Sequence, residues 1–211
     1  MINIGVLISG GGSNLQALID NIKSGMINAQ IKIVVSDHKS AFGLQRAENE
    51  NIKAVFVSKK MAGDNIQFHN NILEILQHEN IDLVVLAGYL SILTPLFIET
   101  YKNKIINIHP ALLPAFGGNG MYGLKVHEAV LNYGAKISGA TVHFVDEGTD
   151  TGAIILQESV EVLANDTPET LQKRVLSIEH KLLPLAVKYF AENKLQIIEN
   201  KGNRTIVKIN G

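Results

Sequence analysis

The sequence of 211 residues contains no cysteine, which rules out a disulfide framework, a thiolate zinc site and a cysteine nucleophile. No apolar run reaches the roughly 18 residues that span a bilayer. The first residues, Met1–Ile4, lack the basic and apolar regions of a signal peptide. An excess of one charge is also missing, since 19 Lys and Arg stand against 20 Asp and Glu. We therefore expect a cytoplasmic protein with no nucleic-acid or membrane partner.

The residues that are present give the composition of an ordinary globular protein, with 46% hydrophobic and 18% charged residues. The chain is long enough to bury a sizeable core. It has no internal repeat, low-complexity segment or linker-like change of composition. Strand and helix patterns alternate along it, so we expect a single domain over residues 1–211.

Apolar runs alternate with helical spacings along the chain. Strands are predicted over 2–8, 31–35, 54–57, 82–88, 105–108, 138–145 and 154–157, followed by a hairpin of 195–198 and 205–209 across Asn200 to Asn203. Helices are predicted over 13–19, 41–49, 66–77 and 127–131, from Thr94, and from Thr167 to Leu185. This order predicts an α/β fold with a doubly wound, mostly parallel, Rossmann-like sheet and a small C-terminal antiparallel portion. Right-handed crossovers would bring the strand ends at Gly10, Gly88 and His109 side by side.

A glycine-rich turn, Ser9-Gly10-Gly11-Gly12-Ser13-Asn14, follows the first strand and leads into a helix. Ser13 with Gln16 three residues later predicts a capping box at the start of that helix. Glycine lets the backbone approach a ligand, and amides at a helix N-terminus bind anions. Gly12, Ser13 and Asn14 are therefore candidate phosphate ligands. The spacing is neither a dinucleotide fingerprint nor a P-loop, and a turn without a ligand explains it equally well.

A second candidate site lies at the end of the predicted strand Ile105-Ile106-Asn107-Ile108-His109, which Pro110 terminates. Because side chains alternate along a strand, Asn107 and His109 point to the same side. Ligands of open α/β sheets bind at the carboxyl ends of strands. An amide can donate to a developing oxyanion, and an imidazole can carry a proton near neutral pH. Taken alone, the pair favours a structural histidine.

Two other segments follow predicted strands. The loop after Gly88 keeps several apolar residues, which could form a wall for a flat, partly apolar ligand or pack over the sheet. His143, next to the acidic turn 146–152, is the only rival to His109 among the seven histidines. No set of residues has the spacing of a metal site.

Several segments, in one order and spacing, resemble the phosphoribosylglycinamide formyltransferase family. They are 8–14, 87–89, 107–110, 112–114, 142–145 and 150–152. The resemblance covers nearly the whole chain and implies the formyltransferase fold, with a nucleotide-binding half over 1–100 and a catalytic and folate-binding half over 101–211. It implies transfer of a formyl group from 10-formyltetrahydrofolate to the amine of phosphoribosylglycinamide in de novo purine biosynthesis, without a metal. The partners are then two small molecules, and the protein is a monomer or a homodimer.

The resemblance also implies site residues. The family's catalytic Asn, His and Asp match Asn107, His109 and Asp150; its nucleotide contacts match Gly12, Ser13, Asn14 and Glu179; its folate contacts match Leu90, Ser91, Ile92, Leu93, Asn107, Val145 and Asp146. In that chemistry Asn107 and a protonated His109 would donate to the tetrahedral oxygen. Asp150 would raise the pKa of His109 and keep this donor available near neutral pH.

Some positions depart from the family pattern. Asn65 and Ser91 stand where members often carry Arg, so neither supplies a cation to meet the glutamate tail of the folate. The loop from Phe116 to Val126 is longer than in many relatives. Asn107, His109 and Asp150 are unaffected, so the resemblance still implies the same reaction.

Other functions stay open at this point. A formyltetrahydrofolate hydrolase would add an N-terminal regulatory domain, and a formyl-tRNA-forming transferase would add a C-terminal domain, for which we expect no room in this chain. A non-catalytic nucleotide-binding module on the same fold would make His109 structural. A nicotinamide oxidoreductase would need the missing dinucleotide fingerprint, and Asp37 is its only candidate for the acid after the second strand.

Overall fold

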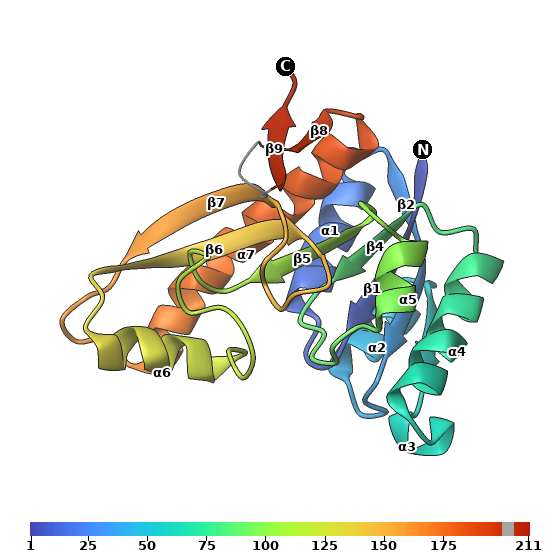
Figure 1. Ribbon diagram of the computed structural model, residues 1–211, viewed down its shortest axis with the longest axis horizontal. Coiled ribbons are helices and arrows are strands. Elements are labelled where there is room, and N and C mark those ends of the chain that lie inside the picture. The colour runs from blue at the N-terminus through green and yellow to red at the C-terminus, as the bar shows by residue number, and fades with distance from the viewer. Residues whose placement is uncertain (200–204) are drawn as a thin grey trace. The chain divides into compact units, whose positions relative to one another are not determined.

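The computed structural model describes residues 1–199 and 205–211, and Figure 1 shows its helices and strands. The chain forms two compact units, Met1–Ile106 and Asn107–Gly211. The first alternates strands and helices. The second carries a long antiparallel strand pair and the longest of the described helices.

Branched apolar residues build the strands of the first unit, and helices connect them. Its elements are β1 (Ile2–Ile8), α1 (Ser13–Lys23), β2 (Ala29–Ser36), α2 (Phe42–Asn49), β3 (Lys53–Phe56), α3 (Lys59–Ala62), α4 (Asn65–His78), β4 (Leu83–Leu86) and α5 (Pro95–Thr100). Strand β1 pairs in parallel with β2 and β4, and β2 pairs in parallel with β3. Every residue of β4 is buried, as expected for a parallel strand covered on both faces.

Strand β5 (Ile105–His109) spans the division between the two units. The second unit continues with α6 (Leu124–Tyr133), β6 (Ile137–Phe144), β7 (Ile154–Glu161), α7 (Pro168–Ala191), β8 (Leu195–Glu199) and β9 (Thr205–Ile209). Strands β6 and β7 pair antiparallel, and α7 packs along both of them (Figure 1). The loops that follow β5 and β6 belong to this unit.

The strands β1 to β7 are hydrogen-bonded in the order β3-β2-β1-β4-β5-β6-β7, and β8 and β9 form a separate antiparallel pair. This order confirms the predicted doubly wound, mostly parallel α/β fold with a small antiparallel portion at the C-terminus. The turn predicted across Asn200 to Asn203 lies outside the described residues. The order reverses at β1, and ligands of such sheets bind beyond the strand ends at the reversal.

The core of the first unit is packed tightly where Leu76 of α4 approaches Gly5 of β1. Phe68, Ile72 and Leu76 of α4 are fully buried. A Cβ added to Gly5 of β1 would lie only 2.7 Å from a methyl group of Leu76, so a glycine permits this approach. Ile66, in the first turn of α4, is 63% exposed. It precedes the buried stripe of α4, which begins at Phe68.

The start of α1 differs from its prediction. Gly12 is the N-cap, with a φ of 69°, and no side chain caps the helix. The predicted capping box of Ser13 with Gln16 is therefore wrong. The Gln16 side chain instead accepts a hydrogen bond from Arg46 at 3.1 Å, because α2 lies against this turn. The first backbone amides of α1 are left without a side-chain cap.

Helix α7 is amphipathic and begins as its sequence predicts. Thr167 caps it and Pro168 is its first residue, where proline costs no hydrogen bond. Its buried face includes Leu171, Val175 and Leu182. No helix in the described parts of the chain is long and apolar enough to cross a membrane.

Candidate active site

The end of β5 brings the amide of Asn107 against the ring of His143 on β6. Asn107 Nδ2 lies 3.1 Å from His143 Nε2. The other ring nitrogen, His143 Nδ1, lies 2.8 Å from the carbonyl oxygen of Phe144, which can only accept a hydrogen bond. Nδ1 therefore carries the hydrogen and donates, so Nε2 accepts from the Asn107 amide. Asn107 is half-buried and His143 is buried.

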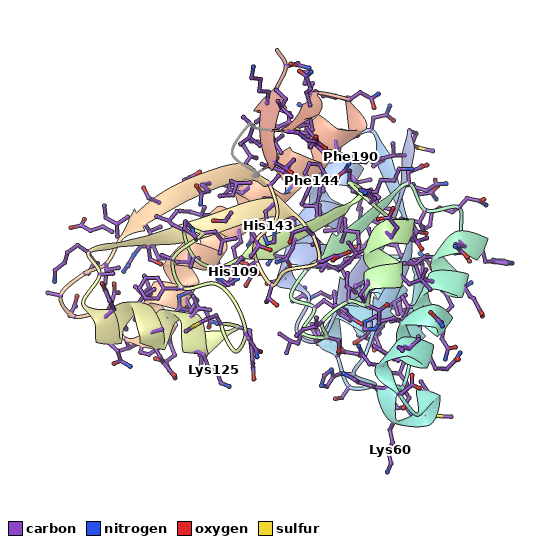
Figure 2. All side chains as sticks on the ribbon, in the orientation of Figure 1. Lys60, His109, Lys125, His143, Phe144 and Phe190 are labelled. Carbon is purple, nitrogen blue, oxygen red and sulfur yellow. The ribbon has the colours of Figure 1, made fainter. Side chains whose placement is uncertain are left out.

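His109 closes β5 with its ring between two oxygen acceptors. Nε2 donates to the carbonyl oxygen of Phe116 at 2.9 Å, and Nδ1 lies 3.4 Å from Oδ2 of Asp150. The other carboxylate oxygen of Asp150 lies 3.6 Å from His143 Nε2. Figure 2 shows the side chains of His109 and His143 close together. One carboxylate thus faces both rings.

Asp150 reaches the rings from the turn between β6 and β7. Its φ of 59° is in the left-handed region, which Asp tolerates better than most residues. Its Oδ2 accepts a hydrogen bond from the backbone N–H of Gly118 at 2.9 Å. A Cβ added to Gly117 would lie 3.3 Å from the Asp150 Cβ and 2.5 Å from a methyl group of Leu113. A glycine at 117 therefore lets the loop after β5 approach the carboxylate closely.

The pKa of His109 is lowered, which corrects the expectation from the sequence. Burial disfavours the imidazolium and outweighs Asp150 and the Phe116 carbonyl, both of which raise the pKa. The neighbouring ring of His143 lowers it as well. The imidazole of His109 is therefore neutral near neutral pH, and it begins as a proton acceptor rather than as a charged donor.

Asp150 is held in its ionised form beside these rings. Burial opposes its ionisation, but its contact with His143, its attraction to His109 and the Gly118 N–H outweigh burial and lower its pKa. The cluster therefore pairs a carboxylate with a neutral imidazole. That carboxylate can stabilise the positive charge that appears when His109 takes a proton.

Thr141 of β6 anchors the backbone that follows His109. Its hydroxyl donates to the Ala111 carbonyl at 2.6 Å and accepts from the Leu113 N–H at 3.0 Å. Gln157 of β7 donates to the same hydroxyl and to the Leu113 carbonyl, each at 2.9 Å. This network fixes the chain direction immediately after the histidine.

His127 of α6 is a buried histidine that the sequence patterns gave no reason to connect with the site. It is fully buried, and its ring nitrogens have no hydrogen-bond partner within the described residues. Burial and, to a smaller extent, His109 lower its pKa to about 4. His127 therefore stays neutral near neutral pH. A lone histidine in a helical pattern carries no signal of such a position.

In the first unit, α2 holds the glycine turn against the start of α1. The Gly43 N–H donates to the Gly10 carbonyl at 3.1 Å, and a Cβ added to Gly12 would lie 2.7 Å from the Cα of Gly43. Arg46 donates from Nε to the Gly11 carbonyl at 2.8 Å. The turn is thus braced by a backbone hydrogen bond and a guanidinium, while the first amides of α1 have no side-chain cap. Such amides suit an anion.

The predicted nucleotide-binding residues are divided between the two units. Gly12, Ser13 and Asn14 lie at the start of α1 in the first unit, and Glu179 lies on the buried face of α7 in the second. Asn14 and Glu179 are each 7% exposed. Both polar groups are thus held in defined positions by their surroundings.

The predicted folate loop after β4 is anchored within the first unit. The Leu90 N–H donates to the hydroxyl of Ser9 at 2.9 Å. Leu90 and Ile92 are 52% and 59% exposed, Ser91 is half-buried between them, and Leu93 is 7% exposed. Two exposed apolar side chains therefore flank Ser91, and Leu93 anchors the end of the loop.

Asp37 follows β2, where a dinucleotide-binding protein would place the acid that binds a ribose. Its Oδ2 accepts from the Ser91 hydroxyl at 2.8 Å, and its Oδ1 lies 2.8 Å from His38 Nδ1. The Asp37 side chain is only 5% exposed. Its carboxylate is already engaged in fixing the loop after β4, which argues against the oxidoreductase.

The predicted folate residues of the second unit follow β6. Val145 is half-buried and Asp146 is exposed. Asp146 Oδ1 accepts from the Thr151 hydroxyl at 2.6 Å and from the Gly148 N–H at 3.1 Å. Asp146 therefore shapes the acidic turn that carries Asp150.

The second unit thus brings together the three side chains that the sequence suggested for catalysis. Asn107 supplies an amide donor, His109 a neutral imidazole and Asp150 a carboxylate beside that ring. Such a set suits a reaction in which a carbonyl carbon becomes tetrahedral and a proton is transferred. Within the described residues, no group of His, Asp or Glu is arranged to hold a metal ion.

Known proteins resemble this chain over most of its length. The Formyl transferase family matches residues 2–187. Phosphoribosylglycinamide formyltransferase of Haemophilus influenzae is 41% identical, over 95% of this chain and 92% of that protein. The chloroplastic enzyme of the same name from Arabidopsis thaliana is 40% identical, over 95% of this chain and 71% of that protein. Glycinamide ribonucleotide transformylase 1 from Symbiobacterium toebii superimposes with a TM-score of 0.92 at 41% identity, covering 100% of this chain and 95% of that one. The chain therefore belongs to the formyl transferase family.

Proposed function

We propose that this protein transfers the formyl group of 10-formyltetrahydrofolate to the amine of phosphoribosylglycinamide, in de novo purine biosynthesis. The products are formylglycinamide ribonucleotide and tetrahydrofolate. The observation that carries the proposal is the cluster of Asn107, His109 and Asp150, with one carboxylate facing the neutral ring of His109. Relatives named for this activity, at about 40% identity over most of the chain, support the same reaction.

Asn107 is proposed to stabilise the oxyanion. When the amine attacks the formyl carbon, negative charge develops on the formyl oxygen. One N–H of the Asn107 amide is used by His143, which leaves the second N–H for that oxygen. Donors fixed in advance stabilise such charge strongly, because they need no reorganisation during the reaction.

His109 is proposed to move the proton. The attacking amine must lose a proton and the folate N10 must gain one as its bond to the formyl carbon breaks. A neutral His109 takes the first proton and returns it to N10, while Asp150 stabilises the intervening imidazolium. Nε2 of His109 now donates to the Phe116 carbonyl. It can accept the amine proton only after the loop at Phe116 gives way and the ring hydrogen moves to Nδ1, which faces Asp150.

The substrates are proposed to bind through groups of different character. The phosphate of the nucleotide would meet the amides of Gly12, Ser13 and Asn14, and Glu179 would contact the rest of that substrate. The folate would use Leu90, Ser91, Ile92, Leu93, Asn107, Val145 and Asp146. The exposed apolar side chains of Leu90 and Ile92 support this assignment, since a pterin is flat and partly apolar.

The proposal extends to the setting of the protein. We expect a single formyltransferase domain that works in the cytoplasm as a monomer or a homodimer, on small-molecule substrates and without a metal, a nucleic acid or a membrane. The residues that the reaction needs are an amide, an imidazole and a carboxylate, and the second unit contains all three.

One assay tests the function. The protein is mixed with 10-formyltetrahydrofolate, with and without phosphoribosylglycinamide, and the folate absorbance is followed. Transfer that requires the amine supports the proposal. Release of formate without the amine would identify a formyltetrahydrofolate hydrolase instead, and no change in either mixture would favour a binding module.

A further inference from the structure

His143 lies in the site without a part in the proton transfer just described. Its side chain is 2% exposed, and it sits on β6 with both ring nitrogens engaged. Nδ1 donates to the Phe144 carbonyl at 2.8 Å, and Nε2 lies 3.1 Å from Asn107 Nδ2. A histidine that only filled the core would not need a polar partner at each of its two ring nitrogens.

The Phe144 carbonyl decides which nitrogen of His143 carries the hydrogen. A carbonyl oxygen accepts only, so Nδ1 carries a hydrogen, and in the neutral ring the lone pair then sits on Nε2. The partner of a lone pair has to be a donor. Asn107 therefore turns its NH₂ group, and not its carbonyl oxygen, toward His143.

The orientation of the Asn107 amide matters because its two ends have opposite chemistry. The NH₂ end donates, whereas the carbonyl end accepts and would repel a developing oxyanion. A half-turn about the last side-chain bond exchanges the two ends with little change of shape. A neighbouring group must therefore favour one orientation of the amide over the other.

We propose that His143 is a positioning residue, whose Nδ1–H tautomer holds the Asn107 amide with its NH₂ end available to the oxyanion. The chain of contacts runs from the Phe144 carbonyl through the His143 ring to the Asn107 amide. Asp150 Oδ1, at 3.6 Å from His143 Nε2, offers only an acceptor to this nitrogen and cannot replace the amide as its donor. The inference deepens the proposed function, since it rests on Asn107 as the oxyanion donor.

A matched pair of substitutions separates positioning from packing. Glutamine places its side-chain amide near the position of the histidine Nε2, whereas asparagine reaches only the position of Nδ1. We expect H143N and H143L to lower kcat by about tenfold or more, because the amide loses its fixed orientation. H143Q should recover most of that rate, and the KM values for both substrates should stay within about twofold in all three variants.

Val142 supplies the packing control. It lies next to His143 on β6, is fully buried and has no polar side chain to contact Asn107. V142A should lower the melting temperature while leaving kcat within about twofold of the wild type. Equal losses of kcat in V142A and H143N would overturn the positioning role.

A double-mutant cycle shows whether His143 acts through Asn107. If it does, adding H143L to N107A should reduce kcat by less than about twofold, because the oriented donor is already gone. Full additivity of the two effects would contradict the inference while leaving the formyl transfer itself intact. A wild type that transfers no formyl group would instead contradict the proposed function.

The tautomer of His143 can be determined by a measurement that does not depend on enzyme activity. Nitrogen-15 spectra of the histidine rings in the wild-type protein near neutral pH should show His143 as the neutral Nδ1–H form with a bare Nε2. Protonation at Nε2 would remove the acceptor and overturn the inference, even if the variants failed to fold.

Discussion

The glycine turn of the first unit and the Asn107–His109–Asp150 cluster of the second are suited to different kinds of charge. The turn offers backbone amides at the start of α1, with Arg46 bonded to the Gly11 carbonyl. Backbone amides do not titrate, so they suit a permanent anion such as a phosphate. The cluster contains two titratable side chains, His109 and Asp150, whose pKa values are lowered. It suits charge that appears and disappears during a reaction.

The comparison teaches that binding and chemistry place different demands on polar groups. A phosphate site needs backbone donors that no side chain caps, and α1 begins in this way at the left-handed backbone of Gly12. A proton carrier needs a pKa below its ordinary value if it is to begin neutral, and burial of His109 supplies that shift. Substitutions in the cluster should therefore lower kcat, whereas substitutions in the turn should raise KM.

The largest effect is expected for N107A. Loss of one oxyanion donor typically reduces turnover about 10²- to 10³-fold, so kcat should fall by this amount while KM for the nucleotide changes little. Steady-state kinetics with both substrates measure it. Asn132, exposed on α6, gives the control N132A, which should keep its full rate. Turnover in N107A within about tenfold of the wild type would remove Asn107 from the chemistry.

The second largest effect is expected for D150N. This variant keeps a side-chain oxygen that can accept the hydrogen bond of the Gly118 N–H, but it loses the negative charge. We expect kcat to fall on the order of 10²-fold, because the imidazolium is no longer stabilised. Asp150 raises the pKa of His109, so its removal should lower that pKa further and move protonation of the ring to a lower pH. Titration of the His109 ring by NMR in both proteins measures the shift. A higher pKa in D150N would contradict this assignment.

The third prediction concerns the turn and compares two glycines. Gly12 and Gly25 both have positive φ values, 69° and 78°, so alanine costs about 1–2 kcal/mol at either place. A Cβ at Gly12 would meet the Cα of Gly43 at 2.7 Å, whereas a Cβ at Gly25 would meet nothing within 4 Å. G12A should therefore raise KM for the nucleotide about tenfold with a smaller change in kcat, while G25A should only lower stability. Equal KM values in the two variants would exclude the turn from nucleotide binding.

The fourth prediction concerns stability rather than activity, and it is a dependence on pH. The pKa of His127 is about 4 in the folded protein and 6.5 when the chain is unfolded. Between these values only the unfolded chain takes up the proton, so the free energy of unfolding falls by about 1.4 kcal/mol for each unit that the pH decreases. H127L should lack this component. Urea unfolding at about pH 5 and pH 8 measures it, and parallel losses in both proteins would show that His127 titrates normally when folded.

Several strands and helix starts of this protein, and the residues that share one side of a strand, could be predicted from its sequence. The apolar run of 82–88 predicted a strand, and β4, which lies within it, is buried throughout. Thr167 and Pro168 marked the start of α7. The spacing of Asn107 and His109 indicated a shared side of one strand. The start of α1 was predicted wrongly, because Arg46 from another helix takes the side chain of Gln16 that the capping box required.

The sequence by itself determined which groups are present and which of them are neighbours along a strand, because side-chain alternation is a local property. Tertiary structure alone decided that His143, 36 residues after Asn107, presents a bare nitrogen to its amide. It also decided that Asp150 and Phe116 approach the ring of His109 from two different loops. The sequence suggested a charged histidine, and burial made it neutral, since desolvation is a property of the whole fold and of no single segment.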